Sequence, residues 1–377
     1  MNNTIDILQK LISLKSLTPE DAGCQDFIAD YLKDIGFTIE VKEFNNVKNM
    51  IARYGTKSPV FAFVGHTDVV AVGDITKWKT DPFQLTEDNG ILYGRGTSDM
   101  KGSIACMLNS IEKFIHHNKD FDGSIVMILT SDEEGPAQNG IKKLVNDNIL
   151  DSYDIEMCLV GEPSSKTKLG DTIKNGRRGS LSAKLQIKGV QGHIAYPHNA
   201  LNPIHKFTPA LDDLINHEYD SGNQYFPPTS FQVSNLNSGI GLSNVIPGIL
   251  DIEFNVRYST ETNDSEIKKT VLNTLKKHNL DYTIEWQHSG EPYLTTKKDF
   301  LDCCIKAIEY ETKDTPDVTT DGGTSDGRFM AKICDQVIEF GLINKSIHKI
   351  NEHTTVNDIQ KLSRIYEDIL SNIFNHR

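Results

Sequence analysis

Three apolar segments of this chain each lead into a residue type that binds metal ions in proteins. The segment PVFAFVG ends in His66, SIVMILTSD leads into Glu133 and Glu134, and MCLVG ends in Glu162. A strand that is apolar at successive positions is typical of a sheet covered on both faces, because neither set of alternate side chains meets water. Since these segments alternate with helical patterns, they predict an α/β domain with a metal site at the ends of its strands.

A glycine-rich turn lies between the first two of these segments. It reads GRGTSDMKG over residues 94–102, where Gly94 and Gly96 permit a tight backbone before an apolar helical pattern. Ser98 or Asp99 can cap that helix, and an ordinary capping aspartate is the simplest interpretation of Asp99 taken alone. The histidine and carboxylates at the ends of the neighbouring strands instead favour Asp99 as a metal ligand that turns both oxygens towards cations.

Length and composition limit the classes of protein to which this chain can belong. The 377 residues are enough for two domains with a core each, and the formal net charge of −13 argues against a nucleic-acid or anionic-membrane surface. No apolar run approaches the ~20 residues of a membrane span, and the N-terminal helical pattern has no basic segment or cleavage site. The six cysteines form no C-x-x-C pair. We therefore expect a soluble, cytoplasmic protein with reduced cysteines.

Similar patterns extend the α/β domain in both directions. A helix that begins at Thr18–Pro19 and ends at Gly36 precedes the first strands, and the alternation returns after Pro292. We expect residues 1–179 and 290–377 to form one discontinuous catalytic domain, with a mixed sheet between helices. The expected strands are 38–44, 49–53, 59–64, 124–131, 155–160 and 336–340, and the expected helices include one from Asp99 to His117, 136–148, one from Asp299, one opened by GGTSDGRF and one from Thr355.

From about Ser180 the pattern changes to strands with a single apolar face. The element order β-α-β-β-α-β is that of a ferredoxin-like sandwich with one open sheet face, and Asn263 with Glu266 form a capping pair for its second helix. We expect residues 180–289 to be an α+β domain inserted into the first. Its expected strands are 181–187, 230–236, 250–258 and 282–287, and its expected helices are 201–217 and 264–278.

The residues near the strand ends can support metal chemistry. His66 and Asp68 are two apart, so their side chains point the same way, and Asp68 can hold the second ring nitrogen of a metal-bound His66. A histidine satisfied by its neighbours is the alternative. Glu133 and Glu134 before Gly-Pro could form a solvated turn, or one could bind metal while the other faces the open coordination position.

A mixed histidine and carboxylate set suits zinc, with cobalt or manganese as substitutes. A shared carboxylate would hold two ions ~3.5–4 Å apart, and metal lowers the pKa of bound water to about 7. Spacing does not decide which histidine completes a second site. His193 lies in a loop of the inserted domain and His348 follows a strand of the first, whereas the helical histidines are expected at the surface: His116, His117, His217 and His278.

The chain resembles the di-zinc amidohydrolases of the M20 peptidase family along essentially its whole length. One departure is Ala71, where the family often has proline after HTDVV. The motifs that carry the resemblance are GHTDVV (65–70), GRGTSDMKG (94–102), TSDEEGPA (130–137), GEPSS (161–165), NGRRGSL (175–181), GVQGHIAYPH (189–198), SNVIPG (243–248), GGTSDGRF (322–329) and SIHKINE (346–352).

The resemblance implies a role for each candidate residue of the site. Asp99 would bridge two zinc ions per subunit, with His66 and Glu162 at the first ion and Glu134 and His348 at the second. Glu133 would be the general base and acid, Asp68 would orient His66, and His193 would stabilise the oxyanion in the partner subunit of a homodimer formed by the inserted lid domain. The residues implied to hold the substrate carboxylates are Arg177, Ser180, Tyr196, Asn244, Arg257, Thr324 and Asn344.

The implied activity is hydrolysis of an amide of a small dicarboxylate. GGTSDGRF and SIHKINE favour N-succinyl-LL-2,6-diaminopimelate, cleaved to succinate and LL-2,6-diaminopimelate in the synthesis of lysine and of diaminopimelate. Two alternatives stay open. Another deacylase of the family, acting on acetylornithine or an acylated amino acid, would share the metal site. A non-catalytic metal-binding dimer would lack a ligand or the glutamate base, and no such position is lost here.

Overall fold

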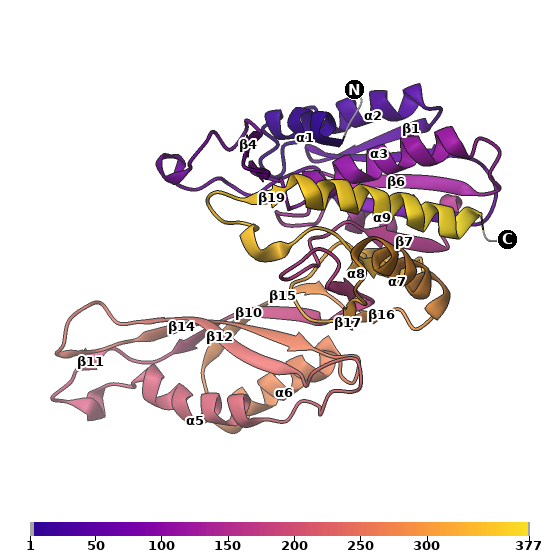
Figure 1. Cartoon of the computed structure of the whole chain (residues 1–377). Helices are drawn as coiled ribbons and strands as arrows, with labels where there is room; N and C mark the ends of the chain where they lie inside the picture. Colours follow the sequence, from indigo (N-terminus) through magenta and orange to yellow (C-terminus); the bar gives the residue numbers. More distant parts are fainter. Residues whose placement is uncertain (1–3, 376–377) are drawn as a thin grey trace. The chain divides into compact units, whose positions relative to one another are not determined.

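The computed structural model describes residues 4–375, which divide into two compact units (Figure 1). The first unit contains the chain up to Gly176, Leu294–Thr319 and the chain from Ser325 onward. The second unit contains Arg177–Tyr293 and Thr320–Thr324. The second unit thus encloses the expected insertion and adds a short segment that the pattern of strands and helices does not predict.

An eight-stranded mixed sheet forms the centre of the first unit among the described residues. Its strand order is β1-β2-β6-β3-β7-β18-β8-β17. The four central strands β6, β3, β7 and β18 run parallel to one another, and β1 and β2 add an antiparallel edge. The bounds are β1 Thr38–Phe44, β2 Val47–Tyr54, β3 Val60–His66, β6 Ser124–Thr130, β7 Met157–Val160, β8 Thr172–Lys174, β17 Asp317–Thr319 and β18 Val337–Glu339.

The middle of this sheet is covered on both faces, as the uniformly apolar segments predict. Every residue of β3 and β6 is buried. Phe61 and Phe63 belong to the core cluster shared with the long helices, while Ala62 and Val64 are buried on the opposite face. The helices of this cluster are α1 Thr4–Ser13, α2 Cys24–Asp34, α3 Lys101–His117, α7 Lys298–Thr312 and α9 Val356–Phe374.

The helix expected from Thr18 begins later, so that part of the prediction is wrong. α2 begins at Cys24, because the preceding residues pair with the loop after β3. The amide of Thr18 donates to the carbonyl of Val69 at 3.0 Å, and the carboxylate of Asp21 accepts from the amide of Gln25 at 3.0 Å. The expected end of this helix is confirmed: the helix stops at Asp34, and Gly36 has φ +99°.

The helix expected over 136–148 is also shorter than predicted. α4 covers only Ile141–Asn146. The carboxylate of Asp132 accepts hydrogen bonds from the amides of Ala137, Gln138 and Asn139, at 3.2, 2.9 and 2.9 Å. These bonds hold the residues before α4 as a turn. Because the Asp132 side chain binds their amides, the helix begins later than the local sequence pattern predicts.

The glycine-rich turn before α3 is capped differently from the prediction. α3 begins at Lys101 after Met100, and neither Ser98 nor Asp99 caps it through its side chain. The amides of Ser98 and Asp99 instead donate to the buried carboxylate of Glu352, each at 3.0 Å. Glu352 lies just before β19 (His353–Thr355), which pairs with β5 (Ile91–Tyr93) in a small sheet that the sequence patterns do not predict.

The second unit has the predicted ferredoxin-like topology. Its antiparallel sheet has the order β12-β14-β10-β15, and two helices pack on one face of it around a separate core. The side chain of Asn263 accepts from the amide of Glu266 at 2.9 Å, which confirms that cap. The bounds are β10 Gly179–Lys188, α5 Pro203–Asn216, β12 Ser230–Ser238, β14 Ile249–Tyr258, α6 Asp264–Lys277 and β15 Tyr282–Gly290.

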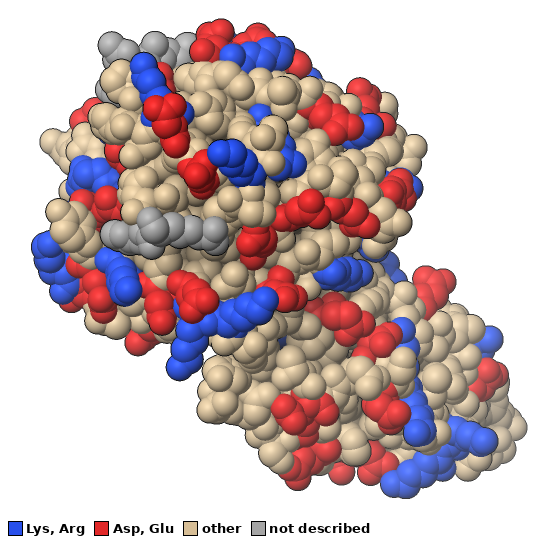
Figure 2. All heavy atoms as spheres, turned by 90° about the vertical axis from the view of Figure 1, so that its right-hand side faces the viewer, with Lys and Arg blue, Asp and Glu red and all other residues tan. Residues whose placement is uncertain are grey.

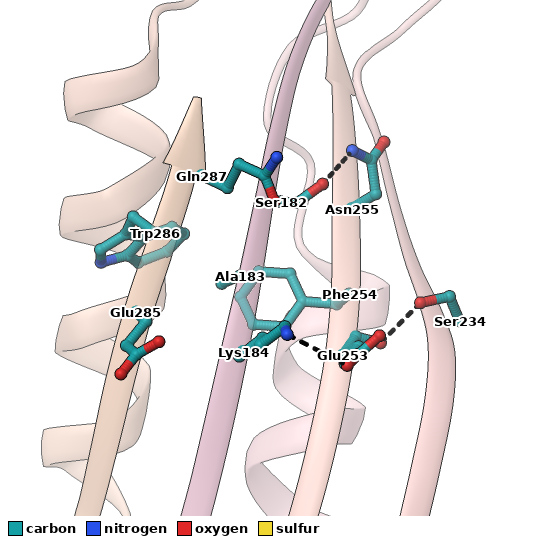
Figure 3. A pocket seen from close by; sticks show the side chains of 10 residues that line it. All are labelled: Ser182, Ala183, Lys184, Ser234, Glu253, Phe254, Asn255, Glu285, Trp286 and Gln287. Carbon is teal, nitrogen blue, oxygen red and sulfur yellow. Dashed lines mark hydrogen bonds and ion pairs between the residues drawn. The ribbon is translucent and has the colours of Figure 1, made fainter. Parts of the chain in front are cut away.

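The other face of this sheet carries polar side chains (Figure 3). Ser182 and Lys184 of β10 stand opposite Asn255 and Glu253 of β14, and the Asn255 amide donates to Ser182 Oγ at 2.8 Å. Trp286 of β15 is drawn away from these polar groups and packs against the core with Phe254. The strands of this unit therefore have one apolar and one polar face, as their alternating pattern predicts.

Acidic and basic side chains intermingle on the face of the molecule shown in Figure 2. Within residues 4–375, no helix is long and apolar enough to cross a membrane. The described cysteines are all free, and most of them are buried.

Candidate metal centre

The strand ends of the first unit bring the predicted metal ligands together. His66 is the last residue of β3, Glu133 and Glu134 follow β6, and Glu162 follows β7. Because β6, β3 and β7 are adjacent parallel strands, their carboxyl ends meet at one edge of the sheet. Asp99 reaches the same edge from the turn before α3.

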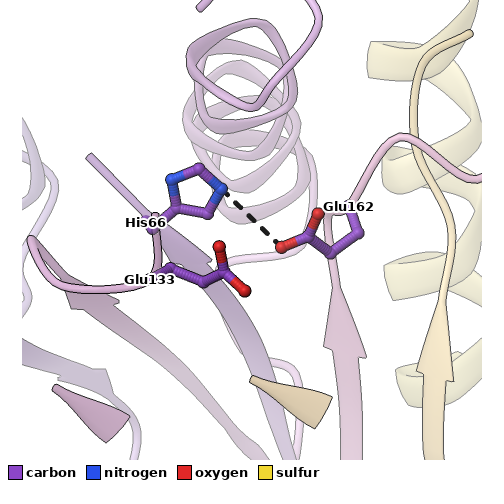
Figure 4. A group of neighbouring side chains, drawn as sticks. All are labelled: His66, Glu133 and Glu162. Atoms are coloured by element: carbon purple, nitrogen blue, oxygen red, sulfur yellow. Dashed lines mark ion pairs between the residues drawn. The ribbon is translucent and has the colours of Figure 1, made fainter. Parts of the chain in front are cut away.

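The first cluster joins His66 to two carboxylates. Nε2 of His66 lies 3.3 Å from Oδ1 of Asp99 and 3.7 Å from Oε1 of Glu162. Figure 4 shows the imidazole of His66 facing Glu162, with the carboxyl of Glu133 beside both. The imidazole is almost wholly buried, with 1% of its surface exposed.

The second cluster uses the other oxygen of the same aspartate. Nε2 of His348 lies 2.9 Å from Oε1 of Glu134 and 3.2 Å from Oδ2 of Asp99. Asp99 thus presents one carboxylate oxygen to His66 and the other to His348. This is the arrangement required of a carboxylate shared between two metal ions.

Unpartnered buried atoms indicate that the first cluster fits a cation. His66 Nε2, Asp99 Oδ1 and Glu162 Oε1 are all buried and have no hydrogen-bond partner. Buried polar atoms without partners are costly, and here three potential ligand atoms face one another. A metal ion bound among them would satisfy all three, and a histidine with carboxylates is a donor set typical of zinc.

The charges of the cluster shift the pKa values of its members. Burial raises the pKa of Glu162 well above its usual range, and the neighbouring Glu133 and Asp99 carboxylates add to the rise. Burial would also raise the pKa of Asp99, but the neighbouring imidazoles of His348 and His66 outweigh it and hold that pKa below its usual range. Hydrogen bonds to Asp99 and Glu134 raise the pKa of His348 to about 10.

Glu133 is a partly buried carboxylate of this site with a raised pKa. Desolvation raises its pKa to about 8; His66 opposes the rise, while Asp326 and Glu134 add to it. A carboxyl oxygen of Glu133 lies within 4.8 Å of ligand atoms of His66 and Glu162.

Asp68 contacts His66 through its backbone, and its carboxylate lies within ion-pair distance of the same ring nitrogen. Nδ1 of His66 donates to the main-chain oxygen of Asp68 at 2.9 Å, whereas the Asp68 carboxylate lies 3.6 Å away. That carboxylate accepts from the amides of Glu133 and Glu134 at 3.3 and 3.1 Å. Asp68 therefore holds both the histidine and the loop that carries the two glutamates.

The residues expected to hold substrate lie mostly in the second unit, where they form two groups. In one group, Ser180 pairs with Arg257 across β10 and β14, and Nη1 of Arg177 donates to the carbonyl of Asp321 at 3.1 Å. Thr324 belongs to the same short segment as Asp321.

The second group surrounds β11 (Gly192–His193). The rings of His193 and Tyr196 lie 5.7 Å apart, and the carbonyl of Asn244 accepts from the amide of Ile194 at 3.0 Å. Tyr196 is exposed. Asn344 belongs to the first unit instead, in the turn that precedes His348.

Three buried charged residues of the first unit have no role predicted from the sequence. Glu352 accepts a hydrogen bond from Nη1 of Arg95 at 2.7 Å, and Arg328 has buried nitrogens without hydrogen-bond partners. Glu352 and Arg328 stand in SIHKINE and GGTSDGRF, and Arg95 stands in GRGTSDMKG. Their position inside these motifs was therefore the one sign in the sequence that these charged residues matter. The spacing of residues alone does not show which partner each of them has.

Comparison with known proteins agrees with this geometry. Residues 62–372 match the model of peptidase family M20/M25/M40. This range contains the whole second unit, most of the first unit and every residue of the two clusters. The chain belongs to this family.

Two relatives are similar along nearly their whole lengths. A succinyl-diaminopimelate desuccinylase of Hydrogenovibrio crunogenus is 52% identical over 375 residues, covering 99% of each chain. A succinyl-diaminopimelate desuccinylase of Nitrosospira multiformis is 50% identical over 367 residues, covering 97% of each chain.

Solved structures of the family share the fold at low sequence identity. An M20 family metallo-carboxypeptidase from Sulfolobus solfataricus superposes with a TM-score of 0.85 at 15% identity, covering 99% of each chain. A dinuclear metal-binding M20 peptidase from Bacillus subtilis superposes with a TM-score of 0.73 at 14% identity, covering 99% of this chain and 98% of the other. These similarities confirm the α/β fold that the sequence predicts.

Proposed function

We propose that the protein is a succinyl-diaminopimelate desuccinylase, which hydrolyses N-succinyl-LL-2,6-diaminopimelate to succinate and LL-2,6-diaminopimelate. The observation that carries the proposal is the identity of 52% and 50% to two desuccinylases over almost the entire chain. The reaction belongs to the synthesis of diaminopimelate and lysine, and a biosynthetic enzyme of this kind would act in the cytoplasm.

The two clusters are proposed to hold two zinc ions per subunit, with cobalt or manganese as substitutes. His66 and Glu162 would bind one ion, Glu134 and His348 the other, and Asp99 both. The shared position of Asp99 between the two histidines supports this assignment. When bound, the two metal ions would lower the pKa of a bound water molecule and polarise the amide carbonyl.

Glu133 is proposed as the proton carrier of the reaction. It would take a proton from the attacking water as the new carbon–oxygen bond forms, and would pass it to the nitrogen as the carbon–nitrogen bond breaks. Desolvation raises the pKa of Glu133 to about 8 in the metal-free site, which brings it towards the range in which a carboxyl can both accept and release a proton. Asp68 would keep this glutamate in place through the amide of Glu133.

The substrate carries carboxylates, which need positively charged and hydrogen-bonding partners. We assign these to Arg177, Arg257 and Ser180, together with Tyr196, Asn244, Thr324 and Asn344. The pairing of Ser180 with Arg257 across the strands supports a shared anion site in the second unit. His193 is proposed to stabilise the developing oxyanion in the partner subunit.

The second unit is proposed to form a homodimer. Its exposed apolar side chains support a protein interface, since single soluble chains rarely expose many such residues together. Those in or near the two-stranded sheet of β11 and β13 (Val245–Ile246) are Val190, Ile194, Leu201, Ile240, Leu242 and Ile249.

The test is amide hydrolysis by zinc-loaded protein, offered N-succinyl-LL-2,6-diaminopimelate and N-acetylornithine in parallel. The expected result is a large preference for the succinyl substrate in the wild type, and loss of hydrolysis in the Glu133→Gln variant. A preference for acetylornithine would contradict the proposed specificity and leave the metal chemistry intact. Hydrolysis of neither substrate by protein with two bound metals would contradict the proposed function.

A further inference from the structure

The carboxylate of Glu352 is buried in the first unit and accepts four hydrogen bonds. Its Oε2 accepts from Nη1 of Arg95 at 2.7 Å and from the amide of Gly96 at 3.0 Å. Its Oε1 accepts from the amides of Ser98 and Asp99, each at 3.0 Å. None of its side chain is exposed, and all four donors belong to the turn that ends in Asp99.

The same turn is bound to the backbone around Glu352. The amide of Gly94 donates to the carbonyl of Glu352 at 3.0 Å, and the hydroxyl of Ser98 donates to the carbonyl of His353 at 2.9 Å. Residues 353–355 then pair with β5, which leads into the turn. The turn and the segment 348–353 are therefore joined by side-chain and main-chain hydrogen bonds.

Arg95 balances the charge of Glu352 and is itself anchored. Its Nη2 donates to the carbonyl of Ala71 at 3.1 Å, and its guanidinium lies 5.3 Å from the ring centre of Trp78. A buried ion pair of this kind adds little net stability, because desolvating two charges offsets their attraction. What it does provide is a single defined geometry, since each oxygen of Glu352 has its own pair of donors.

This geometry connects the shared carboxylate with one of its histidines. Glu352 binds the amide of Asp99, and His348 stands four residues before Glu352 on the same segment. Asp99 must direct one oxygen to His66 and the other to His348. A rotation of the turn would move both oxygens away from these positions.

We propose that Glu352 is a positioning residue, which holds the Asp99 turn against the His348 segment so that both metal sites are formed before metal binds. The inference rests on the metal-binding part of the proposed function. It predicts that loss of the Glu352 carboxylate weakens metal binding, although Glu352 is not itself a ligand.

The test compares Glu352→Gln with Glu311→Gln in metal-free protein titrated with Co²⁺. Glutamine has the same shape but only one acceptor oxygen, so two donors lose their partner and Arg95 loses its counter-charge. Glu311 is the matched control, because its Oε2 pairs with Nε of Arg364 at 2.7 Å, away from the turn. The measurements are Co²⁺ affinity, the Co²⁺ absorption spectrum, and the rise in melting temperature on metal addition.

For Glu352→Gln we expect the affinity for the more weakly bound of the two Co²⁺ ions to fall about 10–100-fold. We also expect an altered Co²⁺ absorption spectrum and a smaller rise in melting temperature on metal addition. Glu311→Gln should keep wild-type values for all three. A purely structural role would lower the melting temperature equally with and without metal. Wild-type affinity, spectrum and metal-dependent stabilisation in Glu352→Gln would overturn the inference.

If Glu352→Gln does not fold, hydrogen exchange of the metal-free wild type decides the question. Peptides covering residues 94–100 should be protected without metal, because the amides already bind Glu352. Rapid exchange that is suppressed only after metal addition would overturn the inference. Wild-type hydrolysis of the succinyl substrate is measured separately, so a failure of the proposed substrate remains distinguishable from a failure of this inference.

Discussion

Nε2 of His348 lies 2.9 Å from Oε1 of Glu134, a residue 214 positions earlier in the chain. The contact joins the loop after β6 to the segment that follows β18, and Asp99 lies within reach of the same nitrogen at 3.2 Å. The three residues come from different parts of the first unit. The second cluster therefore exists only in the folded chain.

Replacing His348 with alanine should remove one of two bound metal ions. The remaining ion would keep His66, Glu162 and Asp99 as ligands. The measurement is metal content after dialysis, by atomic emission. His116→Ala is the control, because His116 is exposed on α3, and it should bind as much metal as the wild type. Two tightly bound ions in His348→Ala would contradict the assignment.

Replacing Glu133 with glutamine should lower kcat by about 10²–10⁴-fold, the usual contribution of a general base. Metal content should not change, since Glu133 is not assigned as a ligand. Glu134→Gln is the comparison, and it should lose metal as well as activity. Near-normal turnover in Glu133→Gln with two metals bound would exclude Glu133 as the proton carrier.

Metal binding at pH 7 should release protons from the protein. The pKa of His348 is raised to about 10 in the metal-free site, so its imidazole is protonated at pH 7 and must lose the proton before it can bind metal. Apparent metal affinity should consequently rise with pH up to that pKa. Calorimetry in buffers of different ionisation enthalpy measures the protons released, and a value of zero would contradict this prediction.

Replacing Gly102 with alanine should destabilise the first unit by about 1–3 kcal/mol, the usual cost of overpacking. A Cβ at Gly102 would lie 2.1 Å from the backbone oxygen of Thr97 and 2.7 Å from Leu342. Urea unfolding measures the change. Gly323→Ala is the control, because a Cβ there has no atom within 4 Å, and its unfolding free energy should stay close to that of the wild type.

The periodicity of apolar residues predicted most of the strands and the longer helices. It succeeds for β3 and β6 because a buried parallel strand excludes polar side chains along its whole length. It succeeds for β14 because alternate residues face a core on one side only. It fails at Thr18, where the amide donates to the carbonyl of Val69 instead of taking part in a helix. It also fails before α4, where the amides donate to the carboxylate of Asp132.

By itself the sequence determined the ligand types at the strand ends, because apolar strands followed by histidine or glutamate are visible as a local pattern. It did not determine how His348, Asp99 and Glu352 combine, since nothing local records which distant side chain accepts a given amide. Only the tertiary structure decided that Asp99 faces two histidines and that Glu352 holds its turn. The physical reason is that buried charges must find partners, and those partners come from separate segments that the folded sheet brings to one edge.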